Sequence, residues 1–145
     1  VDPKQKNFLA YKNCTLFKPN LKEVKEGLKI TIGEITVQNM DKVHTALNEN
    51  LHNTISFITL SEHGVYFSDG KEQKLIPTHI RNISDVSGAG DTVIAVASLV
   101  YASSKNMLLA AEISNIAGGM VCELVGTAPM NKKDLATEVV KLLTK

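Results

Sequence analysis

Cysteine is scarce in this chain of 145 residues. The two present, Cys14 and Cys122, match neither the paired spacing of a zinc site nor a disulfide framework, so we expect free thiols inside the fold. The histidines lie on separate segments, and none lies in a His-Glu-x-x-His or Cys-His arrangement. We therefore expect them at the surface. They are His44, His52, His63 and His79. The sequence therefore does not indicate a metal centre made from these residue types.

Excess charge and long apolar runs are also missing. Sixteen basic residues balance 15 acidic ones, a net charge of +1, so we expect no nucleic-acid partner. The longest strongly apolar helix candidate, residues 92–101, is too short to cross a bilayer, and no positively charged leader precedes an apolar segment. We therefore expect no membrane partner and a cytoplasmic location for the intact protein. A composition of 43% apolar and 21% charged residues predicts one compact unit.

Helical and extended patterns alternate along the chain. Apolar residues at helical spacing predict a helix around residues 43–51, and a β-branched and aromatic run over 54–59 predicts a buried strand. Residues 64–67 and 73–77 predict a hairpin, because an Asp-Gly pair between them suits a tight turn. Three helices are expected beyond it, with Gly126 and Pro129 separating the last two. Their predicted ranges are 92–103, 107–124 and 132–143.

The most informative stretch is residues 85–92, Asp-Val-Ser-Gly-Ala-Gly-Asp-Thr, which opens an apolar run. A helix start presents unpaired N–H groups, and glycine lets a phosphate approach the backbone closely. The amides of Gly88, Ala89 and Gly90 would then neutralise a transferred phosphoryl group, and Asp91 would be the general base. The alternative is an ordinary glycine loop with an aspartate in the first helical turn, where the helix dipole favours it.

A second motif lies at residues 17–23, Phe-Lys-Pro-Asn-Leu-Lys-Glu. Pro19 ends a short apolar segment over residues 14–17, Asn20 is a good N-cap, and Glu23 has the spacing of a capping box. The same geometry suits a second reading, in which the two side chains orient the waters of a Mg²⁺ ion. The sequence leaves both readings open.

With both motifs in this order, the chain resembles the carbohydrate kinases of the ribokinase family. There, Pro-Asn-x-x-Glu lies near the metal and the phosphates, and Asp-x-x-Gly-Ala-Gly-Asp carries the anion hole and the catalytic aspartate. Residues 58–66 are similar to the family's strand and turn that flank the nucleotide. Asn115, Ala117, Gly118 and Gly119 match its Asn-Ala-Ala-Ala helix beside the adenine. The resemblance implies the ribokinase-like fold, an α/β/α sandwich with a central, mainly parallel sheet.

The resemblance also implies ATP and Mg²⁺, and it assigns residues to them. Asp91 would be catalytic with the amides of residues 88–90, and Asn20 and Glu23 would hold Mg²⁺ through water. The remaining nucleotide-binding residues would be Ser61, Glu62, Gly64, Asn115 and Gly118. Close helix packing is an equal alternative for Gly118, and capping or solvent exposure is one for Asn115. The family also allows a monovalent cation beside Asp85 and Ser87.

Within the family, the beginning of the chain resembles one branch. Residues 1–4, Val-Asp-Pro-Lys, and the residues Phe8, Tyr11 and Thr15 are similar to the kinases that phosphorylate D-glycero-D-manno-heptose 7-phosphate on the route to ADP-heptose. Two departures weaken this substrate assignment. Lys18 stands where the branch commonly has Thr, and Gln5 stands where Gly is frequent. Lys18 is either a phosphate neighbour or, more simply, an exposed lysine.

The resemblance covers nearly all of residues 1–145 but only the carboxyl-terminal half of the family pattern. Residues 1–4 are interpreted as the end of a buried strand, and the part that supplies most sugar contacts is absent. Three functions follow as alternatives: part of an ATP-dependent sugar kinase acting on nucleotide and sugar phosphate, a nucleotide-binding module without turnover, or a structural piece that pairs with another chain. An unpaired sheet edge and apolar helix faces predict a homo-oligomer.

Overall fold

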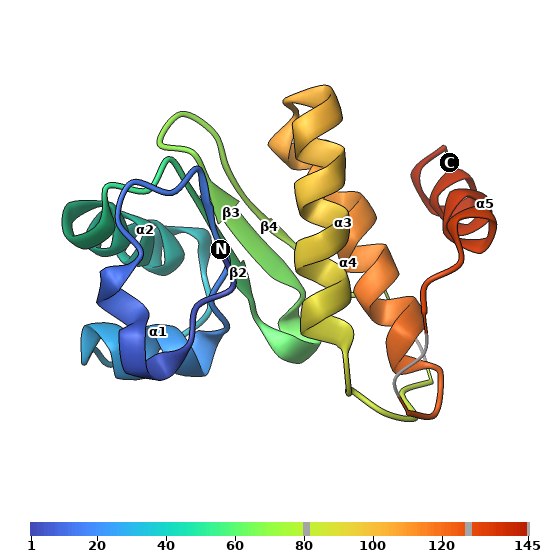
Figure 1. Cartoon of the computed structure of the whole chain (residues 1–145), viewed down its shortest axis with the longest axis horizontal. Coiled ribbons are helices and arrows are strands. Elements are labelled where there is room, and N and C mark those ends of the chain that lie inside the picture. Colours follow the sequence, from blue (N-terminus) through green and yellow to red (C-terminus); the bar gives the residue numbers. More distant parts are fainter. Residues whose placement is uncertain (80–81, 127–128, 145) are drawn as a thin grey trace. The chain divides into compact units, whose positions relative to one another are not determined.

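The computed structural model describes residues 1–79, 82–126 and 129–144, and its elements are coloured along the chain in Figure 1. Where the sequence predicts one compact unit, the chain divides into two, Val1–Pro77 and Thr78–Lys145. Between Ile76 and Ala89, the described residues form neither helix nor strand. This break in regular structure accounts for the division, and each unit is described by itself.

Unit 1 is built on a four-stranded sheet in the order β1-β2-β3-β4. Strand β1 (Leu16–Phe17) pairs in parallel with β2 (Ile55–Thr59), which pairs antiparallel with β3 (Val65–Ser68). Strand β4 (Gln73–Ile76) completes the predicted hairpin antiparallel to β3. The α/β class is confirmed. The described sheet nevertheless has one parallel pairing and two antiparallel ones, because a β-hairpin can join only antiparallel neighbours.

The hairpin turn follows from Asp69 and Gly70. Asp69 Oδ1 accepts hydrogen bonds from the N–H groups of Lys71 and Glu72 at 2.9 and 2.8 Å, and Gly70 has a φ of 81°. A positive φ suits glycine, and an aspartate that bonds its own backbone favours a turn. The predicted hairpin is therefore confirmed, with its turn chemistry.

Helix α2 (Val37–Leu51) provides much of the core of unit 1. It begins where Thr36 Oγ1 accepts the N–H of Asn39 at 3.2 Å, and it packs on β2, β3 and β4. Its buried side chains recur at helical spacing: Met40, Val43, His44, Leu47 and Leu51. The predicted helix is confirmed, but His44 is buried rather than at the surface, because its position falls on the apolar stripe that faces the sheet.

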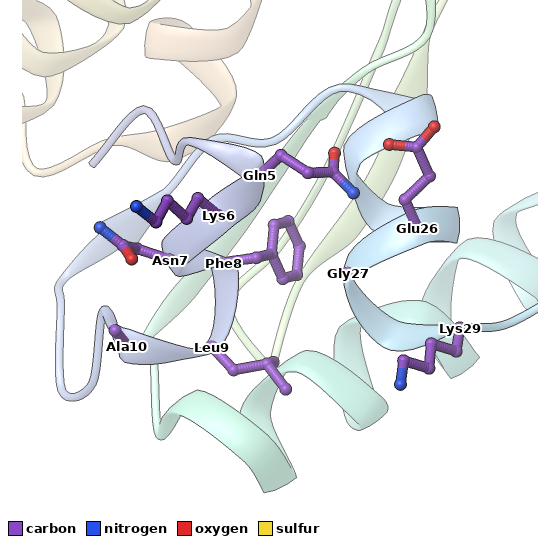
Figure 2. Close-up of a pocket in the computed structure, with 9 residues that line it drawn as sticks. All are labelled: Gln5, Lys6, Asn7, Phe8, Leu9, Ala10, Glu26, Gly27 and Lys29. Carbon is purple, nitrogen blue, oxygen red and sulfur yellow. The ribbon is translucent and has the colours of Figure 1, made fainter.

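The 3-10 helix η1 (Gln5–Ala10) packs beside α1 (Leu21–Leu28) through Phe8. A Cβ atom at Gly27 would lie 2.2 Å from Cδ1 of the Phe8 ring, so the ring occupies the space that a side chain would fill. Figure 2 shows the ring facing Gly27 in a pocket of about 360 Å³ between the two helices. Phe8 also meets Phe17 edge to face, with ring centroids 5.2 Å apart.

The first residues lie alongside β1. The N–H group of Val1 donates to Leu16 O at 2.7 Å, and Lys18 N–H donates to Val1 O at 2.8 Å. These bonds have the alternation of a parallel ladder, which supports the interpretation of residues 1–4 as the end of a strand. Val1 is 41% exposed, however, so its side chain is not buried as that interpretation expected. The adjoining side chains pair too, with Lys18 Nζ 2.9 Å from Asp2 Oδ1. Lys18 is 3% exposed, so the expectation of an exposed lysine is wrong.

Unit 2 consists of helices in the described residues: α3 (Ala89–Ser104), α4 (Met107–Cys122) and α5 (Lys132–Leu143). All three predicted helices are confirmed. Helix α3 starts three residues before the predicted boundary, because the Gly88-Ala89-Gly90 turn already belongs to it. Lys105 in the left-handed region and Asn106, whose Oδ1 accepts the N–H of Leu109 at 2.9 Å, join α3 to α4.

The helices of unit 2 leave apolar side chains exposed. Helix α3 is rich in apolar residues, yet only Val93 and Ala97 are buried, and Leu99 is 72% exposed. A helix that is apolar on most of its faces is normally covered by other elements on most of its faces.

Among the described helices, none combines the length and apolarity needed to span a bilayer. Cys14 and Cys122 are free thiols, as the sequence predicts, but both have intermediate exposure and are not fully buried.

Candidate phosphoryl-transfer site

In unit 1, two predicted segments lie at one edge of the sheet. Asn20 follows β1 and forms a parallel bridge with Thr59, the last residue of β2, and Thr59 N–H donates to Pro19 O at 3.1 Å. The turn that contains Ser61 follows β2 directly. Because neighbouring parallel strands end at the same edge, the structure brings the Pro-Asn-x-x-Glu motif and this turn together. Ligands commonly bind at the carboxyl ends of strands in α/β sheets.

Asn20 and Glu23 form the complete capping box of α1. Asn20 Oδ1 accepts the Glu23 N–H at 2.8 Å, and Glu23 Oε2 accepts the Asn20 N–H at 2.7 Å. The capping interpretation is therefore confirmed. It leaves the second Glu23 oxygen, Oε1, without a hydrogen-bond partner among the described residues. A part-exposed carboxylate oxygen suits the hydrated Mg²⁺ ion, so the pair fits both roles.

The residues predicted to flank the nucleotide form a tight turn between β2 and β3. Leu60 N–H donates to Gly64 O at 2.8 Å, and Gly64 N–H donates to Ser61 O at 3.1 Å. Gly64 has φ 89° and ψ −132°, a conformation essentially limited to glycine. Ser61 and Glu62 are exposed on this turn. The turn alone accounts for the glycine, and the nucleotide role of these residues stays a prediction.

In unit 2, the glycine motif lies at the start of α3, where the sequence predicts it. Gly88 is the N-cap residue with a φ of 78°, and its carbonyl accepts the Thr92 N–H at 3.0 Å. Among the residues that the structure describes, no partner is found for the N–H groups of Gly90 and Asp91. Asp91 is exposed in the same first turn. Unpaired donors and an accessible carboxylate are what an anion site with a general base requires.

Asp85 connects this loop to the chain beyond α4. Its Oδ1 accepts the Ser87 N–H at 2.9 Å, and its Oδ2 accepts the Gly126 N–H at 3.1 Å. The hydrogen bonds from Ser87, followed by the one from Gly126, hold the pKa of Asp85 below its ordinary value, so it stays ionised. The Asp-x-Ser spacing predicts the first bond, but no local signal could have predicted the second across 41 residues.

Gly118 and Asn115 occupy α4. A Cβ at Gly118 would lie 2.6 Å from Val93 Cγ2 and 3.9 Å from the Ala89 carbonyl oxygen, so Gly118 lies beside the first turn of α3. This contact supports the packing alternative for the glycine. Asn115, one turn earlier, is buried at 8% exposure, which rules out the alternative that it faces solvent. The adenine-side role of both residues stays a prediction.

The family model described as "pfkB family carbohydrate kinase" matches residues 2–134. The chain therefore belongs to the pfkB family of carbohydrate kinases. The resemblance read from the Pro-Asn-x-x-Glu and Gly-Ala-Gly-Asp motifs is confirmed.

The relatives with curated names include two called "Bifunctional protein HldE". The protein from Campylobacter curvus is 37% identical over 131 residues, which is 90% of this chain and 27% of that protein. The protein from Helicobacter hepaticus is 38% identical over 127 residues, 88% of this chain and 26% of that protein. The chain thus spans about a quarter of the length of these relatives.

Solved structures show the same fold. Phosphofructokinase-2 from Escherichia coli, in complex with substrates and products, matches with a TM-score of 0.84 at 17% identity, covering 100% of this chain and 47% of that one. Ribokinase from Arabidopsis thaliana, complexed with ribose and ATP, matches with a TM-score of 0.77 at 14% identity, covering 98% and 45%. These matches confirm the ribokinase-like fold class.

Proposed function

We propose that this chain is the nucleotide-binding and phosphoryl-transfer part of a kinase that transfers the γ-phosphoryl group of ATP to a hydroxyl of a sugar phosphate. The observation that carries the proposal is the start of α3, where unpartnered N–H groups and the exposed Asp91 carboxylate share one turn. Membership of the pfkB family supports it, because the resemblance to carbohydrate kinases places the anion hole and the catalytic aspartate in the motif at this turn.

Each residue of this turn has a separate task. The Asp91 carboxylate takes the proton of the attacking hydroxyl while the hydroxyl oxygen bonds to the γ-phosphorus and the bond to the β-γ bridging oxygen breaks, which releases ADP. The N–H groups of Gly90 and Asp91 donate to the phosphoryl oxygens as charge develops there. This set differs from the predicted amides of residues 88–90, because the Ala89 N–H already donates to Val86 O at 3.3 Å. Gly88, with its positive φ, lets the chain enter the helix so that these groups point outward.

Asn20 and Glu23 are proposed to hold Mg²⁺ through its waters. When bound, the ion neutralises negative charge on the phosphates. The Glu23 carboxylate orients a water through Oε1 while Oε2 keeps the cap of α1. A monovalent cation is also proposed beside Asp85 and Ser87. The Asp85 carboxylate stays ionised there, and a phosphofructokinase-2 structure of the same fold is described as a complex with potassium.

The acceptor is proposed to be D-glycero-D-manno-heptose 7-phosphate, in ADP-heptose and lipopolysaccharide precursor synthesis. The resemblance of residues 1–15 to the branch that uses this sugar supports it, as do relatives named HldE at 37% and 38% identity. The buried Lys18, which stands where that branch commonly has Thr, is paired with Asp2 rather than free. An enzyme that draws on ATP and a sugar phosphate is expected in the cytoplasm.

We also propose that residues 1–145 are the carboxyl-terminal half of the kinase domain. The chain covers 47% and 45% of two solved kinases of the same fold. The exposed apolar residues of α3 support this proposal, because a helix of such composition is normally covered. The second candidate function, a nucleotide-binding module without turnover, retains the turns at Gly64 and Gly88 but lacks a complete sugar site.

The proposed function is tested on the complete gene product that carries this chain. ATP turnover is measured by coupled ADP release with three acceptors: D-glycero-D-manno-heptose 7-phosphate, fructose 6-phosphate and ribose. We predict the highest kcat/KM with the heptose. A preference for either other sugar would overturn the substrate assignment while leaving the kinase intact. Absence of acceptor-dependent ADP release with any of a wide panel of sugars would favour the module without turnover.

A further inference from the structure

Polar side chains gather in the core of unit 1. His44, Asn53, Ser56 and Ser68 are all buried where α2 packs on the sheet, and His44 is 7% exposed. Burial of a polar group is costly unless the group is hydrogen-bonded, so such clusters are rarely without consequence. The function proposed above makes no use of any of them.

Three of these side chains form a chain of hydrogen bonds centred on Ser56. Asn53 Nδ2 donates to Ser56 Oγ at 2.9 Å, and Ser56 Oγ lies 2.9 Å from His44 Nδ1. Ser56 Oγ accepts the amide proton, and we assign its own proton to a hydrogen bond with His44 Nδ1. The ring is then neutral with its proton on Nε2. These hydrogen bonds connect His44 on α2 with Ser56 on β2.

At the Asn53 end of this series of hydrogen bonds, one acceptor is unused. Asn53 Oδ1 is buried and has no hydrogen-bond partner among the described residues. If His44 Nδ1 carried a proton, it would donate to Ser56 Oγ, and the serine proton would need another acceptor. A rotation of the Asn53 amide would present Oδ1 to it. The same rotation would remove the Asn53 Nδ2 bond to Ser56 Oγ, so protonation of His44 disrupts the present hydrogen bonds.

The charged and titratable groups around His44 come from three elements. Asp41 lies one turn earlier on α2, Asp69 lies in the turn between β3 and β4, and Tyr66 on β3 donates its hydroxyl to Asp41 Oδ1 at 3.4 Å. Burial raises the pKa of Tyr66, so it adds no charge. Burial also lowers the pKa of His44, and this outweighs the attraction of Asp41 and Asp69 for a protonated ring.

We propose that Asn53, Ser56 and His44 form an acid-sensitive latch that holds α2 on β2 and loosens when His44 takes up a proton. The folded state then binds fewer protons than the unfolded state, so stability rises with pH wherever the two differ. The contribution of the latch is complete above about pH 6.5, the ordinary pKa of histidine, and it falls as the pH drops below that value. Proton uptake by His44 places a charge in the core and disrupts the hydrogen bonds among Asn53, Ser56 and His44.

The first test is a titration of the full chain with ¹⁵N-labelled histidines. The latch predicts that His44 at pH 7.5 carries its proton on Nε2 and that its Nδ1 shift is that of a hydrogen-bond acceptor. It also predicts a titration midpoint below that of His44 in the urea-unfolded chain. A proton on Nδ1 at pH 7.5, or a midpoint equal to the unfolded one, would overturn the proposal without any variant.

The second test measures urea unfolding midpoints at pH 7.5 and 5.5. We expect the native chain to lose stability at pH 5.5, with faster amide exchange in α2 after correction for intrinsic rates. His44→Gln keeps an acceptor for Ser56 but does not titrate, so it should reduce this pH dependence, whereas His63→Gln, in an exposed turn, should preserve it. An undiminished pH dependence in His44→Gln would contradict the latch. If that variant does not fold, the histidine titration decides alone.

Discussion

Gly118 of α4 lies so close to Val93 of α3 that a Cβ atom added to the glycine would be 2.6 Å from Val93 Cγ2. Real Cβ contacts are not this short, so the two helices approach as they do only because position 118 lacks a side chain. Val93 follows Asp91 by two residues. The contact therefore fixes the start of α3, which carries the proposed catalytic turn, against α4.

Gly118→Ala should destabilise unit 2 even though alanine is the better helix former. Alanine in a helix gains about 1 kcal/mol over glycine, but overpacking a tight contact typically costs about 1–3 kcal/mol. We expect the overpacking to be larger, because the neighbouring atom belongs to a β-branched side chain with few rotamers. Urea unfolding followed by circular dichroism measures the difference.

A double variant provides the control for this prediction. Val93→Ala removes the Cγ2 atom that the new methyl group would meet. Gly118→Ala should then cost less in the Val93→Ala background than in the native chain. Equal effects in both backgrounds would mean that Val93 is not the cause.

The fold was predictable from the sequence to the extent that its signals are local. The helix around Val43 and the hairpin at Asp69 follow from apolar spacing and turn chemistry within a few residues. Burial of Lys18 was not predictable in this way, because it depends on a partner distant in sequence, Asp2. His44 falls on the local apolar stripe of α2, but its hydrogen-bond partner Ser56 could not be predicted from that spacing.

In the candidate site, too, local features were predictable from the sequence and tertiary contacts were not. The spacing of Asn20 and Glu23 predicted the capping box, and both of its hydrogen bonds are present. The spacing could not decide between capping and metal binding, because one carboxylate has an oxygen for each. The link from Asp85 to Gly126 is a tertiary contact without a sequence pattern.

Glu23→Gln separates the two roles of Glu23. The glutamine carbonyl oxygen can still accept the Asn20 N–H, so the cap of α1 is kept, whereas the negative charge beside the proposed metal is lost. We expect the free energy of unfolding to change by less than about 1 kcal/mol, the usual effect of losing a cap. In the complete protein, the Mg²⁺ concentration needed for half-maximal activity should rise more than the KM for the sugar.

Glu26→Gln is the matched control, because Glu26 is an exposed acid on the same helix, 3.9 Å from Lys22 Nζ. It should leave the magnesium titration unchanged. A fall in thermal stability of Glu23→Gln with an unmoved magnesium titration would show that Glu23 serves only as a cap.

Asp85→Asn should loosen the loop that leads into α3. The two N–H groups of Ser87 and Gly126 donate to different oxygens of Asp85, and asparagine replaces one of these oxygens with an NH2 group that cannot accept, so one of the two bonds is lost. Amide exchange at Ser87 or Gly126 is expected to quicken. Asp69→Asn, in a comparable turn of unit 1, should not alter exchange at either position. Unchanged protection of both amides in Asp85→Asn would contradict the role given to this carboxylate.

The 145-residue chain alone should self-associate, bind ATP or ADP weakly and fail to phosphorylate heptose 7-phosphate. Exposed apolar residues such as Leu99 and Val140 favour association, and the turns at Gly64 and Gly88 lie within the chain. Sedimentation, nucleotide titration and an ADP-release assay check these outcomes. A monomer with full kinase activity would overturn the half-domain proposal, and a folded chain without nucleotide binding would favour a structural role.

The central claim is that Asp91 is the general base of a phosphoryl transfer, and the kcat of Asp91→Asn in the complete protein tests it most directly. General-base catalysis contributes roughly 10²- to 10⁴-fold, so we expect kcat to fall by about that factor while the Kd for ATP changes little. Asp134→Asn alters an acid in the first turn of α5 and serves as the control, with kcat unchanged. An Asp91→Asn enzyme with near-native kcat would contradict the account.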